Sequence, residues 1–179
     1  MVRVVVKFVA AILMGCGLVE LAWAQTPTPA KPLDQAFASS LTDIPAQALS
    51  VNGGIYVPAY SSVSIVQGKV RADFSVTVSI HNASQTKPLV LKRVGYFDTS
   101  GQLVQDYLPK PLALKPFGAI EIFISQNDVR GGTGANFLVE WGSVGPIAEP
   151  VAEALMVGGI GAGHYAFISQ GRPIRVVGN

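Results

Sequence analysis

The stretch VRADFSVTVSIH, residues 70–81, alternates apolar and polar side chains along its whole length. One face would carry Val70, Ala72, Phe74, Val76, Val78 and Ile80. The other face would carry Arg71, Asp73, Ser75, Thr77, Ser79 and His81. Because successive side chains of a β-strand point to opposite sides, this pattern predicts a strand with one face on a core and the other in water, as in antiparallel sheets.

Similar segments continue along the chain, separated by turn residues. Asn82-Ala83-Ser84 begins a turn, and Asp98-Thr99-Ser100-Gly101 is typical of a hairpin in which Gly101 takes a positive φ angle. The predicted strands cover residues 55–65, 70–81, 89–97, 103–108, 119–125, 137–141, 151–157 and 165–169, the last with an extension through 174. Seven to eight short strands without a long helix predict an all-β, immunoglobulin-like antiparallel β-sandwich over residues 50–179.

The N-terminal segment has the features of an export signal. Arg3 and Lys7 precede an uncharged apolar run over residues 8–19, and Ala22-Trp23-Ala24 supplies small residues for cleavage before Gln25. The run is shorter than the roughly 20 apolar residues of a membrane-spanning helix. We therefore expect a signal peptide over residues 1–24 and a periplasmic or secreted protein.

Cys16 supports an alternative to this cleavage. Leu13-Met14-Gly15-Cys16 has the Leu and Gly of a bacterial lipobox, in which Cys16 would be lipidated and would anchor the chain in the cell envelope. Cys16 is also the single cysteine of the chain, so no internal disulfide is expected.

Between the signal and the sandwich, residues 25–49 are expected to form a Pro/Thr linker. Leu33, Phe37 and Leu41 recur there at helical spacing and predict a short helix. Whether this helix docks on the domain is left open by the sequence.

The charge balance excludes several classes of function. Lys and Arg number 13 against 11 Asp and Glu, and charged residues make up 13% of the chain, compared with about 25% in a typical domain. The resulting net charge of +2 gives no electrostatic basis for binding nucleic acid or an anionic lipid surface. The expected partner is an envelope protein or a small ligand, with membrane contact only through the anchor that Cys16 would carry.

Two glycine-rich runs share part of the pattern of phosphate-binding loops. Gly161, Gly163 and Ala166 satisfy G-x-G-x-x-A. A dinucleotide site also requires an acidic residue further along the chain, and none follows Ala166. Residues 158–163 therefore predict a flexible hairpin loop, and no cofactor is expected. The run from Arg130 to Asn136 lacks the Gly-Lys-Ser/Thr ending of a P-loop. It predicts a turn capped by Asn136, with an anion-binding nest of backbone N–H groups beside Arg130 as the alternative.

No catalytic or metal-binding group is assigned from the sequence. His81 and His164 have no second ligand at metal-binding spacing, and no G-x-S-x-G elbow is present. Glu140, beside Trp141, is expected to face solvent on a strand, unless a second carboxylate meets it in the folded chain. The candidates for an aromatic patch, to be separated by exposure, are Tyr56, Pro58, Tyr60, Tyr96, Tyr107 and Trp141.

Several stretches carry a family resemblance, the most specific being GGTGANFLVEW over residues 131–141. The others are residues 56–61, 79–82, 96–104, 150–156 and 167–172. Together they resemble a bacterial family of exported proteins known as domain of unknown function 3124. The resemblance implies export, often with a lipid anchor, and supplies no activity and no catalytic residue. The Asn82 turn and the hairpin at residues 96–101 are also similar, more loosely, to extracytoplasmic immunoglobulin-like sandwiches.

From these features we expect an exported sandwich that binds a partner or ligand in the cell envelope, rather than an enzyme. The residues expected to take part in binding are Arg130, Asn136, Glu140 and Trp141. Two alternatives stay open: a hydrolase with an unrecognised carboxylate pair, and a small-anion sensor that uses the glycine-rich loop after Arg130.

Overall fold

In the computed structural model, which describes residues 31–178, the predicted strand over residues 70–81 forms as two strands that belong to different sheets. β4 (Val70–Asp73) pairs with β3 (Ser62–Ile65) in a two-stranded sheet, whereas β5 (Ser75–His81) is part of a larger sheet. Phe74 lies between them, buried, and its N–H donates to the carbonyl of Ser61 at 2.9 Å. The alternation therefore continues through a point where the chain changes sheets.

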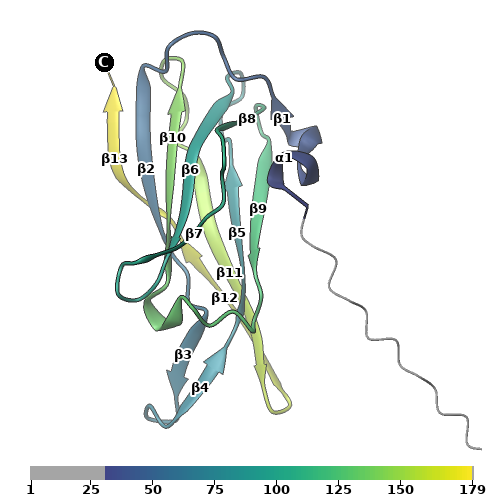
Figure 1. Cartoon of the computed structure of the whole chain (residues 1–179), viewed down its shortest axis with the longest axis vertical. Coiled ribbons are helices and arrows are strands. Elements are labelled where there is room, and N and C mark those ends of the chain that lie inside the picture. Colours follow the sequence, from purple (N-terminus) through teal and green to yellow (C-terminus); the bar gives the residue numbers. More distant parts are fainter. Residues whose placement is uncertain (1–30, 179) are drawn as a thin grey trace, which may run out of the picture. The chain divides into compact units, whose positions relative to one another are not determined.

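The larger of the two main sheets has seven strands, all paired antiparallel (Figure 1). In spatial order its strands are β1 (Leu41–Thr42), β8 (Leu112–Leu114), β6 (Leu89–Phe97), β10 (Asn136–Ser143), β2 (Val51–Pro58) and β13 (Arg172–Gly178), with β7 (Leu103–Asp106) paired to β6.

The other main sheet has four antiparallel strands and forms the second layer of the sandwich (Figure 1). Its order is β12 (Gly163–Gln170), β11 (Val151–Ile160), β5 and β9 (Ala119–Ile124). Between the layers lies one hydrophobic core, to which β2, β5, β6, β9, β10 and β11 contribute buried side chains. Trp141, Tyr96 and Phe137 are the largest of these, and the Tyr96 and Phe137 rings stack with centroids 4.9 Å apart.

The fold confirms the predicted all-β sandwich. Among the described residues, eight strands have six or more residues, and the remaining five are pieces of two to four. The predicted strand over residues 55–65 splits into β2 and β3. The predicted extension from 165 through 174 instead becomes two strands, since the chain leaves the four-stranded sheet after β12 and enters the seven-stranded sheet as β13.

The segment before the sandwich is built into it from residue 31 onward. α1 (Leu33–Ala36) and the 3₁₀-helix η1 (Ala38–Ser40) form the short helix, and β1 follows immediately. Leu33, Phe37 and Leu41 pack against the core, and Lys115 donates its backbone N–H to the carbonyl of Ser40 at 3.0 Å. The predicted signal peptide, Cys16 and the first part of the predicted linker lie outside the described residues.

The predicted turns at Asn82 and at Asp98 both form. The Asn82 side chain holds the first as a hydrogen-bond donor, and the Asp98 side chain holds the second as an acceptor. Asn82 is buried, and its amide group donates to the carbonyls of Lys87, Leu114 and Lys115 at 2.9–3.2 Å. In the other turn the Asp98 carboxylate accepts the Ser100 hydroxyl and the N–H groups of Gln102 and Ser100, and these hydrogen bonds lower its pKa. Gly101 has the expected positive φ angle, 81°.

Candidate functional site

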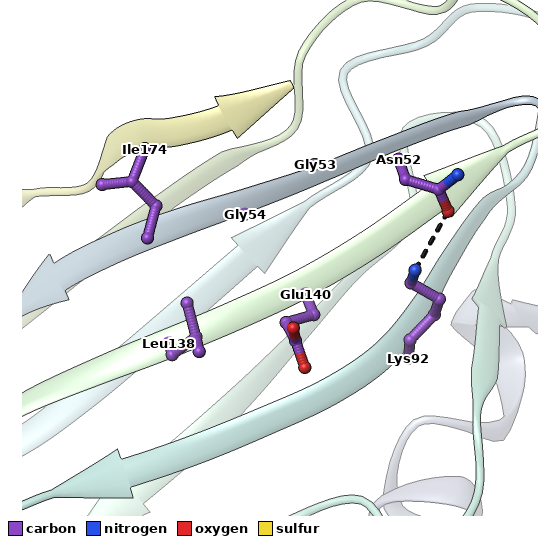
Figure 2. A pocket seen from close by; sticks show the side chains of 7 residues that line it. All are labelled: Asn52, Gly53, Gly54, Lys92, Leu138, Glu140 and Ile174. Atoms are coloured by element: carbon purple, nitrogen blue, oxygen red, sulfur yellow. Dashed lines mark hydrogen bonds between the residues drawn. The ribbon is translucent and has the colours of Figure 1, made fainter. Parts of the chain in front are cut away.

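Glu140 lies on the outer face of the seven-stranded sheet, at the centre of an open groove of about 410 Å³. The groove is lined by Asn52, Gly53, Gly54, Lys92, Leu138, Glu140 and Ile174, and we call it the Glu140 groove. Figure 2 shows Glu140 between Leu138 on one side and the Lys92–Asn52 pair on the other. Its side chain is partly exposed, as the strand pattern predicts.

Two adjacent glycines of β2 make this groove, for different reasons. In the strand register Gly53 is opposite Trp141 and Gly54 is opposite Glu140. A Cβ atom on Gly53 would lie 2.4 Å from Cε2 of the Trp141 indole, so this glycine lets the indole pack flat in the core. A Cβ atom on Gly54 would meet Ile174 and Leu138 at 3.5 and 3.8 Å, which is ordinary contact. Gly54 therefore leaves open the floor of the groove beside Glu140.

The polar end of the groove depends on an irregularity in strand pairing. Glu140 is opposite Arg93, whereas Trp141 is opposite Leu91, so Lys92 is an extra residue in β6. Such a bulge redirects the side chains around it. Lys92 donates its ammonium group to Oδ1 of Asn52 at 3.0 Å. The groove thus presents one cation and one anion, beside the apolar side chains of Leu138 and Ile174.

The charged neighbours of Glu140 across β10 belong to β6 and β7. Its register neighbour Arg93 is bound to Asp106, with Nε 2.7 Å from the carboxylate. Within the described part of the chain, Glu140 is the single carboxylate among the residues that line the groove. A glycosidase-type mechanism needs two carboxyl groups about 5–10 Å apart around the bond to be cleaved.

Arg130, another residue that was predicted to take part in binding, lies in the loop before β10 and forms an ion pair with Asp128. Its Nε and Nη2 donate to the two oxygens of Asp128 at 2.8 and 2.7 Å. This bidentate pair lowers the pKa of Asp128 and raises that of Arg130. The charge that the anion-sensor alternative requires is therefore already neutralised.

The glycine-rich loop after Arg130 is fastened to the domain by its own polar groups. Gly134 donates its N–H to Oγ1 of Thr99 at 2.9 Å, and Gly132 donates its N–H to the carbonyl of Val129 at 3.1 Å. Asn136 donates to the carbonyl of Gly134 at 3.1 Å, so it caps the loop as predicted. These internal hydrogen bonds use N–H groups that an anion-binding nest would need.

Beneath this loop two tyrosines are enclosed. The Tyr96 hydroxyl is buried, finds no hydrogen-bond partner among the described residues, and lies where a Cβ atom on Gly131 would come within 2.0 Å of it. Burial raises the pKa of Tyr96, and it raises the pKa of Tyr107 to about 12. Glycine at 131 is therefore a packing requirement of the loop.

Exposure separates the aromatic residues that the sequence left ambiguous. Trp141 is only 2% exposed, so this predicted binding residue lies in the core and supports the floor of the groove from below. Tyr56 and Tyr60 are 38% and 36% exposed and line a neighbouring groove with Pro58, Ile168 and Arg172. Sequence reasoning missed the part played by Gly54, Lys92 and Ile174, because a strand register and a bulge bring them to Glu140.

His81 and His164 are both exposed. Residues 31–178 contain no group of three or more His, Cys, Asp or Glu side chains arranged to hold a metal ion. The same residues contain no helix that is long and apolar enough to cross a membrane.

Comparison with known proteins places the chain in a family. No curated protein matches it. One similar solved structure is the crystal structure of Thermotoga maritima 1070, which is 9% identical to this chain. The match covers 67% of this chain and 92% of that chain, with a TM-score of 0.37. A family model matches residues 52–174, from Asn52 at one end of the groove to Ile174 at its side. The chain therefore belongs to the family described as "Protein of unknown function (DUF3124)".

Proposed function

We propose that this protein is an exported β-sandwich that binds a partner or ligand of the cell envelope through the Glu140 groove. The observation that carries the proposal is the composition of the groove, in which the Glu140 carboxylate and the Lys92 ammonium flank apolar side chains over a glycine floor. A surface of this kind fits an amphipathic segment that has polar groups next to an apolar one.

The exposure of Ile174 supports this function. Ile174 is exposed on β13 and stands across Gly54 from Leu138, so the groove has an apolar wall that the fold itself does not cover. A ligand on the floor would bury this wall and contact Glu140 from the same side.

The test is cross-linked capture of the tagged full chain from its native envelope, followed by mass spectrometry. Glu140→Gln removes the charge, and Gly54→Val fills the floor. Glu121→Gln is the matched control, because Glu121 is an exposed strand glutamate on β9 in the other sheet. We expect each groove variant to reduce capture of the same partner at least about tenfold, Glu140→Gln through the loss of a charge-assisted contact and Gly54→Val through the space that its side chain takes from the ligand.

Folding is checked by thermal unfolding of each variant. Glu140→Gln is expected to melt like the unmodified chain, since the side chain is partly exposed. A partner that is captured equally by the groove variants and by Glu121→Gln would contradict the assignment of the groove. The absence of any specific partner would direct the same variants to a screen of small molecules by thermal shift.

Export itself is tested on the intact protein. Mass spectrometry of the chain isolated from the envelope should find an N-terminus at Gln25 if the signal peptide is cleaved after Ala24. A lipid on Cys16 would instead establish the anchored form. An N-terminus at Met1 in the cytoplasm would contradict export.

A further inference from the structure

The four-stranded sheet ends in an edge strand that lacks the usual protection against pairing. β12 has the sequence GHYAFISQ and pairs with β11 alone, over eight residues without a register shift. It contains no Lys, Arg, Asp, Glu or Pro. Natural edge strands are commonly blocked by charges, prolines, bulges or short length, because their free N–H and C=O groups otherwise pair with another strand.

The other edges of the two main sheets carry such protection. β13 has Arg172 and Pro173 and a register shift between Pro173 and Arg175. β9 carries Glu121, β1 has two residues, and β7 has four residues and ends at Asp106. Among the edge strands of these sheets in the described chain, β12 is the long one without charge, proline or bulge.

An apolar row on the outer face of the sheet leads to this edge. Ile168 of β12 is opposite Leu155 of β11, and Leu155 and Phe123 are both opposite Thr77 of β5. Ile168, Leu155 and Phe123 are 60%, 39% and 62% exposed. Edge and row together form one surface, which we call the β12 surface.

We propose that two copies of this chain associate by antiparallel pairing of β12 with β12. A two-fold contact uses the same surface on both copies, so every side chain meets a neighbour from the same short sequence. A charged strand would then bring like charges together, which destabilises cross-strand pairs. β12 contains no Lys, Arg, Asp or Glu, so no register of self-pairing brings two such charges together. Its free N–H and C=O groups pair with another strand, which a second copy of β12 supplies.

The geometry predicts what such pairing does to Ile168. A two-fold axis perpendicular to the sheet keeps each side chain on its own face, so residues opposite each other share a face and the axis passes through a residue of β12. With the axis at Phe167, residues 164–170 pair, Ile168 is opposite Ala166 of the other copy, and the two Ile168 side chains are diagonal neighbours on the outer face. The apolar row then continues from one copy into the next. Pairing along the seven residues 164–170 covers a strip of about 24 Å, at ~3.4 Å per residue.

The experiment is sedimentation velocity of the purified full chain over a wide range of protein concentration. Ile168→Lys and Ile168→Glu each place a charge near its own copy, and we expect each to weaken association at least about tenfold. An equimolar mixture of the two variants should restore it, because opposite charges then meet. Leu103→Lys is the matched control, since Leu103 is also an exposed apolar strand residue, 49% exposed, but lies on β7 of the other sheet and outside the Glu140 groove.

The outcomes separate the proposal from the alternatives. Association of the unmodified chain and of Leu103→Lys, its loss in both Ile168 variants, and its return in the mixture support β12 pairing. A monomer at every concentration overturns the proposal, as does a dimer that the Ile168 variants leave unchanged. Loss without return in the mixture also overturns it, since the contact then does not bring the two Ile168 positions together. Thermal unfolding confirms that each variant is folded.

Discussion

Replacing Gly53 by alanine would place a methyl group in space that the Trp141 indole occupies. The new Cβ atom would lie 2.4–2.5 Å from three indole atoms, whereas carbon atoms pack favourably at about 3.5–4.0 Å. The indole therefore has to move by about 1 Å or more. Trp141 is only 2% exposed and belongs to the close-packed core, so such a movement displaces its neighbours as well.

The loss of stability expected for Gly53→Ala can be estimated from other overpacked cores. Extra methyl groups in a close-packed core typically cost 1–3 kcal/mol, and a contact this short on a buried indole belongs at the upper end. We expect Gly53→Ala to lower the free energy of unfolding by about 2–3 kcal/mol. With a urea m-value of about 2 kcal/mol/M, the unfolding midpoint would fall by roughly 1 M.

The neighbouring glycine provides the matched control. Gly54→Ala adds the same methyl group to the same strand, but at 3.5 Å or more from Ile174 and Leu138. Because alanine also loses less backbone entropy than glycine on folding, we expect a change between zero and a gain of about 0.5–1 kcal/mol. The assay is urea unfolding of both variants and the unmodified chain, followed by circular dichroism.

Equal stabilities of the two alanine variants would refute this reasoning, because it would mean that the indole does not cover Gly53. A change of the m-value in Gly53→Ala would indicate altered compactness instead of local overpacking, and would call for a structure of the variant.

Four other variants or conditions test the core, the turn at Asn82 and the loop. Val76→Asp would bury an unpaired charge and should abolish cooperative unfolding; a normal melt would contradict the two-face assignment of β5. Asn82→Asp replaces a donor that faces three carbonyls with an acceptor and should cost about 3 kcal/mol or more in urea unfolding. Tyr96→Phe removes a buried hydroxyl without a hydrogen bond, so stability should stay equal or rise by about 1 kcal/mol, and a clear loss would reveal a hidden partner. Arg130 holds the pKa of Asp128 below its ordinary value of 3.8, so this carboxylate stabilises the fold above pH ~4 and that contribution is lost on acidification. Asp128→Asn should thus be less stable than the unmodified chain at pH 7, with the difference shrinking below pH ~4 in unfolding curves.

The fold class was predictable because it depends on short-range patterns. Alternation over residues 70–81, the hairpin at Asp98 and the turn at Asn82 each specify a local conformation, and all three occur in the structure. The alternation could not show that the strand breaks at Phe74, since a residue between two sheets and a residue within one strand are buried in the same way. The register between strands decides that, and register depends on partners far away in the chain.

The features of the candidate site also fall into those set by the local sequence and those set by contacts between distant residues. The sequence by itself determined that Glu140 faces away from the core and that Asn136 caps a glycine-rich turn, since strand alternation and turn chemistry are local properties. It could not place Trp141, because a large aromatic residue packs equally well in a core or on a rim. Only the tertiary structure brought Lys92, Gly54 and Ile174 to Glu140. These contacts join side chains whose positions are set by strand order and by one extra residue in β6, and neither leaves a mark in the local sequence.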